Sequence, residues 1–257
     1  MKKLFTYLLF LSLSVGMFGQ RVGIIASSAS SGGGGGSTLL NGLLGGWKLD
    51  EASGNAADVL GVYTGTSTAI TYTASGKLGR CYTFNGTSSN VSFGNVIKPT
   101  TAITISAWVK TSATSTNEAI LDCAVYGTGW EGYSMVIYTD GAVGFFLGTN
   151  TATILDIAAN PIYPTLVNNG AWHHIVATWD GGTARIYVDN TTSGSGTSYS
   201  TSVVYDGSNG LYLGQQPGGT NKFIGDIDMT YIWNRALGVS GVDSLFTKEN
   251  IGITYPW

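Results

Sequence analysis

The chain has 257 residues and a formal net charge of −3, and only 11% of its residues are charged, against about 25% in an ordinary globular domain. Glycine accounts for 38 residues and aromatic residues for 12%. This composition indicates a β-rich extracellular domain rather than a helical cytosolic enzyme. A weakly acidic chain without a basic patch is also not expected to bind nucleic acid.

Residues 1–19 have the layout of a secretory signal peptide. Lys2 and Lys3 precede an apolar run from Leu4 to Val15, and small residues follow. The run is shorter than the ~20 residues that a membrane-spanning helix needs. We therefore expect the mature protein to begin near Gln20, to be secreted or held at the cell surface, and to have no membrane span.

Residues 20–44 are expected to form a short arm and a flexible linker. SSASSGGGGGS, residues 27–37, has the composition of a flexible linker. It separates RVGIIA, residues 21–26, from the rest of the chain. Two interpretations of this arm stay open: a segment that docks on an assembly partner, and a disordered stub.

Residues 45–257 are expected to form one β-sandwich domain, because strand-sized runs alternate there with turns. SMVIYTDGAVGFFLG predicts a hairpin with a two-residue turn at Asp140-Gly141. AWHHIVATWDGGTARIYVD, residues 171–189, predicts a second hairpin that turns at Asp180-Gly181-Gly182. Only VSGVDSLFTKEN, near the end, is expected to be helical. The pattern predicts an all-β fold, a two-sheet antiparallel jelly-roll sandwich with one short C-terminal helix.

His173 and His174 are the only histidines of the chain. On a strand, adjacent side chains point to opposite faces, so the two cannot both bind one metal ion. A buried histidine with structural hydrogen bonds is the better interpretation for at least one of them.

Cys81 and Cys123 are the only cysteines. An even number in an exported chain permits one disulfide. The alternative is two separate buried thiols, which behave as small apolar side chains. The sequence leaves both interpretations open.

Six segments follow one another along residues 45–246: GWKLDEASGNAADVLG, GKLGRCYTFNGTSSNVSFGN, TISAWVKT, AWHHIVATWDGGTARIYVDN, LYLGQQ and FIGDIDMTYIWNRALGVSGVDSLF. This order resembles the laminin G-like branch of the concanavalin A-like lectin and glucanase superfamily. The resemblance implies a two-sheet jelly roll that binds a glycan or a protein surface, often as an exported module and often with one calcium ion.

The resemblance also implies where calcium would bind. Asp58 lies in the polar segment NAADVLG and Asp228 in the G-x-ID segment of the last strand, and both are expected ligands, with carbonyls such as that of Gly61. Asp50 is a weaker choice. The alternative is that Asp58 caps a turn and Asp228 accepts hydrogen bonds from the backbone.

A sugar-binding site would combine an exposed aromatic ring with nearby amides. Two expected loops offer both, AVYGTGWEGYS (residues 124–134) and LGQQPGGTNK (residues 213–222). The alternative is that Trp130 covers an edge of the core. The expected ligand contacts are Trp130, Tyr126, Glu131, Gln215, Gln216 and Asn221.

A glycoside hydrolase generally needs two carboxylates on either side of the bond that it cleaves. The related glucanases carry them as Glu-x-Asp-x-x-Glu, and none of the four glutamates lies in that pattern. The nearest arrangement is Asp226-Ile-Asp228. We therefore expect a binding module that recognises carbohydrate or a protein surface, in adhesion, and catalyses nothing. The alternatives are a structural protein of a cell-surface or phage assembly, docked through its N-terminal arm, and a divergent glycoside hydrolase.

Overall fold

The computed structural model describes residues 39–127, 130–149, 154–158, 166–197, 202–208 and 210–256. The expected signal peptide, the arm and the Gly/Ser-rich linker lie outside the described residues. The described chain begins inside the domain, because Leu39 is fully buried and its carbonyl accepts a 2.7 Å hydrogen bond from Trp233 Nε1. The sandwich therefore starts several residues before the expected boundary at residue 45.

In the described residues, two antiparallel sheets of eight strands each make up the fold, which confirms the all-β sandwich. The first sheet contains β1 (Leu43–Trp47), β3 (Thr71–Thr73), β4 (Cys81–Asn85), β6 (Ile103–Lys110), β12 (His173–Trp179), β13 (Thr183–Val188), β14 (Thr191–Thr197) and β16 (Ile224–Trp233). The second contains β2 (Thr66–Thr68), β5 (Asn90–Gly94), β7 (Glu118–Asp122), β8 (Val125–Tyr126), β9 (Trp130–Ile137), β10 (Val143–Thr149), β11 (Ile154–Ala158) and β15 (Leu211–Leu213).

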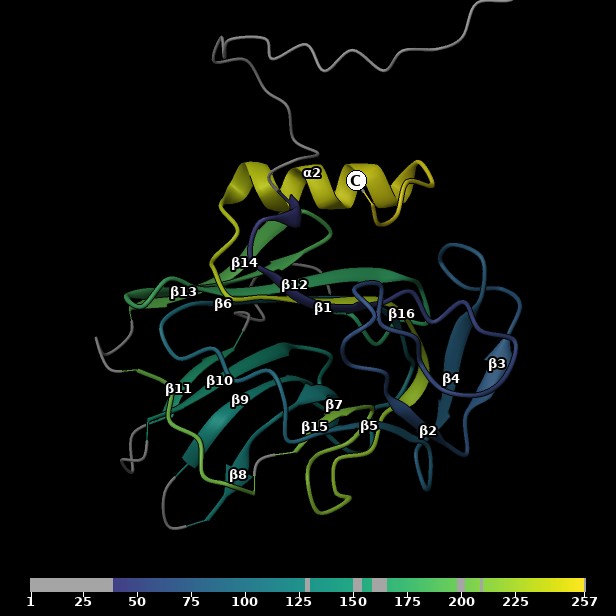
Figure 1. The fold of residues 1–257 in the computed structure, drawn as a ribbon, viewed down its shortest axis with the longest axis horizontal. Helices are drawn as coiled ribbons and strands as arrows, with labels where there is room; N and C mark the ends of the chain where they lie inside the picture. Colours follow the sequence, from purple (N-terminus) through teal and green to yellow (C-terminus); the bar gives the residue numbers. More distant parts are fainter. Residues whose placement is uncertain are drawn as a thin grey trace, which may run out of the picture. The chain divides into compact units, whose positions relative to one another are not determined.

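Strands that are distant in sequence are neighbours in both sheets. The first has the order β14-β13-β12-β6-β16-β4-β3, with β1 beside β16, and the second has the order β11-β10-β9-β7-β15-β5-β2, with β8 beside β9. Figure 1 shows the sheets as two layers, with helix α2 (Val239–Asn250) across the outer face of the first. The helix has the bounds that the sequence predicts.

Period-two alternation explains how β12 serves both faces of the first sheet. Ile175, Ala177 and Trp179 pack into the core between the sheets. Val176 instead joins the smaller cluster beneath α2, which includes Val242 and Leu245 of the helix. One strand therefore supplies side chains to two apolar layers.

The same alternation separates the two histidines. His173 Nδ1 lies 2.7 Å from Asp189 Oδ2, whereas His174 is fully buried and its Nε2 lies 2.9 Å from Ser106 Oγ. The two histidine side chains therefore have separate hydrogen-bond partners. His174 is a fully buried histidine with a structural hydrogen bond, and His173 is buried as well.

Both predicted hairpins are present, with one difference. Tyr138 N donates to Ala142 O over 2.8 Å, so three residues form the first turn instead of two. Gly141 adopts a φ of 83°, which favours glycine. In the second turn, Asp180 Oδ1 accepts hydrogen bonds from the backbone N–H groups of the two residues that close it.

The disulfide interpretation of the two cysteines is wrong. Cys81 lies on β4 of the first sheet and Cys123 follows β7 of the second, and both remain thiols. Each is fully buried, and burial raises the pKa of each thiol to about 12. The two therefore act as small core side chains.

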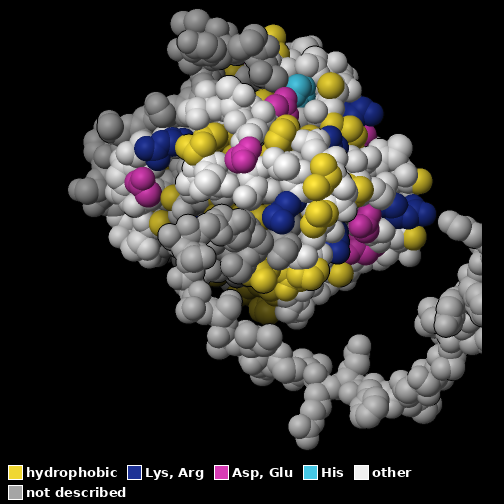
Figure 2. Space-filling view, turned by 90° about the horizontal axis from the view of Figure 1, so that it is seen from above, with side chains coloured by type: hydrophobic (Ala, Val, Ile, Leu, Met, Phe, Trp, Pro, Cys, Tyr) yellow, Lys and Arg dark blue, Asp and Glu magenta, His cyan; other side chains and the backbone are white. Residues whose placement is uncertain are grey.

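The outer face of α2 is mixed in character. Val239 and Ile251 are largely exposed, and Figure 2, which views the molecule from this side, shows Lys, Arg, Asp and Glu side chains among the apolar ones. The inner side of the helix carries a buried carboxyl instead. Glu249 Oε2 accepts a 2.7 Å hydrogen bond from Trp108 Nε1 and lies 3.5 Å from His174 Nε2.

Burial keeps this contact uncharged. It raises the pKa of Glu249 well above its usual value and lowers the pKa of His174 to about 3. Glu249 therefore fixes α2 to the first sheet through its hydrogen bond from Trp108, and its contact with His174 is not an ion pair.

We expect Glu249→Ala to lower the free energy of unfolding by about 1–3 kcal/mol, because Trp108 Nε1 then stays buried without an acceptor. Glu249→Gln keeps a carbonyl acceptor and should cost less. Urea denaturation of both variants measures the difference. An equal loss of unfolding free energy in the two variants would contradict this role of the Glu249 hydrogen bond.

Candidate functional site

The outer face of the second sheet carries the candidate site. Alternation along β9 and β10 sends one set of side chains into the core, namely Tyr133, Met135, Ile137, Phe145 and Leu147. The intervening positions point outward. They are Trp130, Gly132, Ser134 and Val136 on β9, and Gly144, Phe146 and Gly148 on β10.

A cavity of about 330 Å³ opens on this face. Four of the residues that the sequence analysis selected line it, namely Tyr126, Trp130, Gln216 and Asn221. Four others complete the lining, namely Asn117, Val136, Tyr138 and Phe146. The structure thus brings residues from five separate segments into one site of the size that small ligands use.

Aromatic rings form a continuous row along the cavity. The ring centroid of Trp130 lies 4.8 Å from that of Tyr126, edge to face, and 6.2 Å from that of Phe146, with only 25° between the latter two ring planes. Tyr138 follows at 6.4 Å from Phe146. Rings in contact with each other lose little freedom on binding and offer apolar faces to a ligand.

Carboxamides supply the polar side of the cavity. Gln216 belongs to the predicted loop after β15, which is closed by hydrogen bonds between Gln216 and Thr220. Asn221 ends this loop, and its carbonyl accepts a 2.8 Å hydrogen bond from Ala119 N. This bond draws the loop to β7, just after Asn117.

A buried carboxyl group fixes the Tyr126 end of the aromatic row. Asp122 Oδ2 accepts hydrogen bonds of 2.5 Å from both Tyr126 Oη and Ser134 Oγ, and Oδ1 accepts one of 2.8 Å from Ala124 N. Asp122 is fully buried, and burial raises its pKa to about 7, against the opposing effect of these hydrogen bonds. Tyr126 is therefore held against Trp130 by a group that no ligand touches.

Two of the six expected ligand contacts do not line the cavity. Glu131 and Gln215 each adjoin a lining residue, and on β9 the side chain of Glu131 faces the opposite way from that of Trp130. Gln215 Oε1 accepts a 2.7 Å hydrogen bond from Lys222 Nζ instead. The expected loop around Trp130 is also wrong in part, since Trp130 and Glu131 begin strand β9.

The sequence analysis missed Tyr138 and Phe146. The segment GFFLG contained a usable signal, because two consecutive phenylalanines on a strand must face opposite sides. Phe145 packs in the core, so Phe146 has to face outward. Tyr138 lies beside it because its ring covers Gly144, at the position that a Cβ atom would occupy.

Asp58 does not have the environment of a calcium ligand. Its Oδ1 accepts hydrogen bonds from Gly46 N and Leu60 N, and its Oδ2 accepts from Val62 N and Tyr63 N, all between 2.9 and 3.2 Å. A carboxylate offers about four lone-pair directions, and all are used here. Asp58 holds a turn of the backbone.

Asp228 differs from Asp58, because one of its two carboxylate oxygens accepts no hydrogen bond. Its Oδ2 accepts a 3.1 Å hydrogen bond from Leu78 N, but its Oδ1 is buried without a hydrogen-bond partner. Burial and, to a smaller extent, the nearby charge of Asp50 raise the pKa of Asp228 to about 8. Asp50 accepts a 2.8 Å hydrogen bond from Arg80 N in the same turn. Among the described residues, no group of three or more His, Cys, Asp or Glu side chains is arranged to hold a metal ion.

The Asp226/Asp228 pair lies on β16 of the first sheet. Asp226 Oδ1 accepts a hydrogen bond from Thr83 Oγ1, and its Oδ2 lies 3.9 Å from Lys110 Nζ. Asp228 is fully buried. Neither lines the cavity on the second sheet.

Comparison with known proteins places the fold in one family. The family model for the concanavalin A-like lectin/glucanases superfamily matches residues 85–243. Human neuronal pentraxin-1 is 31% identical over 155 residues, which are 57% of this chain and 34% of that protein. The chain spans only 2% of two longer curated relatives. In the described part of the chain, no helix has the length and apolar character needed to cross a membrane.

Solved structures share the fold at low sequence identity. The binding domain of Paraclostridial Mosquitocidal Protein 1 matches with a TM-score of 0.67 and 16% identity, over 81% of this chain and 52% of that one. Domain 4 of AbnA, a GH43 extracellular arabinanase from Geobacillus stearothermophilus, solved with arabinotriose, matches with a TM-score of 0.60 and 20% identity, over 79% of this chain and 97% of that one.

Asp122→Asn tests the buried carboxyl. Folded Asp122 keeps its proton up to about pH 7, whereas in the unfolded chain it loses the proton near pH 4. Between these values folding takes up a proton, so the contribution of Asp122 to stability is complete at low pH and is lost as the pH rises toward 7.

We therefore expect the free energy of unfolding of the native protein, minus that of Asp122→Asn, to fall by up to about 1.4 kcal/mol per pH unit across this interval. Urea denaturation of both proteins between about pH 4 and pH 8 measures it. The difference between the proteins is the informative quantity, because other buried groups such as His174 titrate in both. A difference that stays constant with pH would contradict the assignment.

Proposed function

The chain belongs to the concanavalin A-like lectin/glucanases superfamily, and we propose that it is an exported, non-catalytic module that binds glycans in the cavity on the outer face of its second sheet. The observation that carries the proposal is the joining of an aromatic row to carboxamides in one cavity. A sugar ring has an apolar C–H face and a rim of hydroxyl groups. Rings can pack against the first, and carboxamides both donate to and accept from the second.

The comparisons support a binding module by fold. One structural neighbour is the binding domain of Paraclostridial Mosquitocidal Protein 1, and another is an arabinanase domain in complex with arabinotriose. Both share less than 25% of their residues with this chain, so they support the sandwich and not particular contacts. The site itself rests on this chain's own residues.

Export and a role in adhesion belong to the proposal as well. The basic and apolar layout of residues 1–19 supports secretion. A glycan-binding domain outside the cell, behind a flexible linker, is suited to recognising a surface. Docking of residues 21–26 on an assembly partner remains a hypothesis, because the arm lies outside the described residues.

We expect Trp130→Ala to lower glycan affinity at least tenfold, since the variant removes the central ring of the row and a lost aromatic contact at the centre of a site costs about 2 kcal/mol or more. The measurement is titration calorimetry with the strongest ligand from a glycan array.

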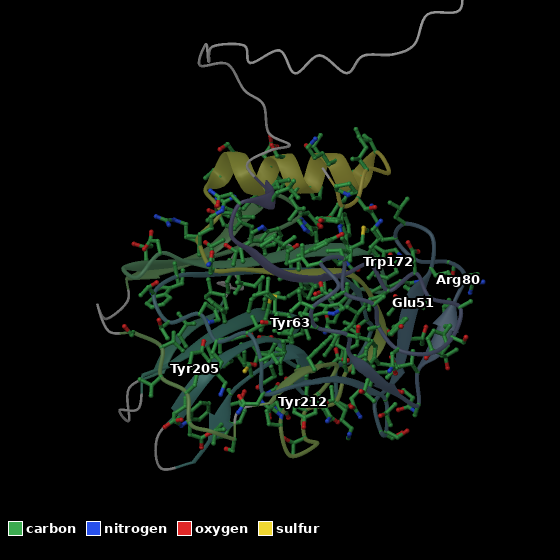
Figure 3. The ribbon with its side chains drawn as sticks, viewed as in Figure 1. Glu51, Tyr63, Arg80, Trp172, Tyr205 and Tyr212 are labelled. Carbon is green, nitrogen blue, oxygen red and sulfur yellow. The ribbon has the colours of Figure 1, made fainter. Side chains whose placement is uncertain are left out.

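Tyr212→Ala is the matched control. Tyr212 also stands on the second sheet (Figure 3), between two core residues of β15, and does not line the cavity. Its loss should leave binding unchanged. Equal effects of the two substitutions, or none from Trp130→Ala, would refute the location of the site.

Calcium binding is a second part of the proposal. The proposed ligands are now Asp228 and Asp50, and Asp58 is no longer among them. The support is the buried Oδ1 of Asp228, which a cation would satisfy, and the position of both carboxylates at the turn of residues 76–80. Oxygen ligands of this kind suit calcium. The ion would join the last strand to this turn.

We expect calcium to raise the melting temperature of the native protein, because a ligand that binds only the folded state stabilises it, by about 2.7 kcal/mol at a hundred times Kd. Asp228→Asn should abolish this shift. Asp58→Asn should lower stability equally with calcium and with a chelator, since it removes acceptors of backbone N–H groups. A calcium shift that survives in Asp228→Asn but disappears in Asp58→Asn would reverse the assignment.

A further inference from the structure

We infer that the cavity on the second sheet selects uncharged glycans and discriminates against acidic ones, such as sialylated chains; this inference rests on the proposed function. It concerns the chemistry of the lining and of the groups directly behind it.

The polar lining consists of carboxamides. Asn117, Gln216 and Asn221 each carry donors and an acceptor, which match hydroxyl groups. Two of the acceptors are already in use, since Asn117 Oδ1 accepts from Thr139 N and Gln216 Oε1 accepts from Thr220 Oγ1. The remaining lining residues are aromatic rings and Val136. Recognition of a carboxylate or sulfate generally uses Arg, Lys or converging N–H groups, and the described lining has neither cationic side chain.

The cation nearest in sequence is directed elsewhere. Lys222 follows Asn221 directly, but its Nζ donates to Gln215 Oε1 over 2.7 Å. Gln215 is the neighbour of Gln216 that does not line the cavity. The ammonium group is thus held by a residue outside the lining.

Negative charge lies behind the aromatic row. Asp122 Oδ2 accepts a hydrogen bond from the hydroxyl group of Tyr126. Because burial raises the pKa of Asp122 to about 7, this carboxyl group is ionised in slightly alkaline solution. Residues 128–129 and 150–153, which adjoin β9 and β10 in sequence, contain no charged residue.

Charge and shape therefore act together. An anionic ligand would lose water without gaining a cation, and would approach a buried carboxylate, which like charge disfavours. A neutral ring can instead lie against the aromatic row of Trp130 and Phe146, with its hydroxyl groups toward the carboxamides. The cavity of about 330 Å³ suits a short stretch of sugar units.

The test is a glycan array in matched pairs, in which each neutral oligosaccharide is present with and without a terminal sialic acid, applied to the full mature chain at about pH 8. Neutral members should bind, and their sialylated counterparts should bind at least about tenfold more weakly wherever the acid reaches the cavity. Titration calorimetry of the best pair gives the ratio.

Asn117→Lys supplies the missing cation, and Asn117→Gln is its matched control. The lysine variant should reduce or reverse the preference in affinity for the neutral member over the sialylated one, whereas the glutamine variant should keep this preference. Equal or tighter binding of sialylated chains by the native protein would overturn the inference and leave glycan binding standing. Binding of neither member by a folded sample would overturn the proposed function, and the inference with it.

Discussion

Strict alternation of side chains along β9 and β10 is the constraint on which the site depends. Both strands must bury one residue in two, because the sandwich has a single core between its sheets. The remaining positions then face outward together, and they place Trp130 and Phe146 side by side. The aromatic row is therefore a direct consequence of the packing that stabilises the fold, and it stands on rigid strands rather than on a loop.

A buried acid turns this surface into a defined site. Asp122 joins β7, β8 and β9 through hydrogen bonds from Tyr126, Ser134 and Ala124. Burial of a carboxyl group costs free energy unless it is protonated or well hydrogen-bonded, and Asp122 has three donors. The same arrangement holds one end of the row in place and sets the charge behind it. Asp122 therefore contributes both to the geometry of the site and to its proposed selectivity for uncharged ligands.

The sequence alone predicted the architecture well, because alternation and turn residues are local signals, and it selected Trp130 and Gln216 from their chemistry. It did not reveal Phe146, whose outward direction follows only from the placement of the residue before it in the core. The role of Asp122 depends on which N–H and O–H groups the folded chain brings to it, so no local pattern encodes it. Disulfide pairing failed for the same reason, because the two cysteines belong to different sheets. Turn capping by Asp58, in contrast, was one of the two interpretations of the sequence, and most of its donors are local.

The most direct test of the account is a crystal structure of the chain with the first glycan that binds it. The account predicts a sugar ring against Trp130 and Phe146, with hydroxyl groups within hydrogen-bond distance of the carboxamides of Asn117, Gln216 or Asn221. A glycan bound elsewhere, for example over α2 or at the turn of residues 76–80, with the cavity on the second sheet left empty, would contradict it.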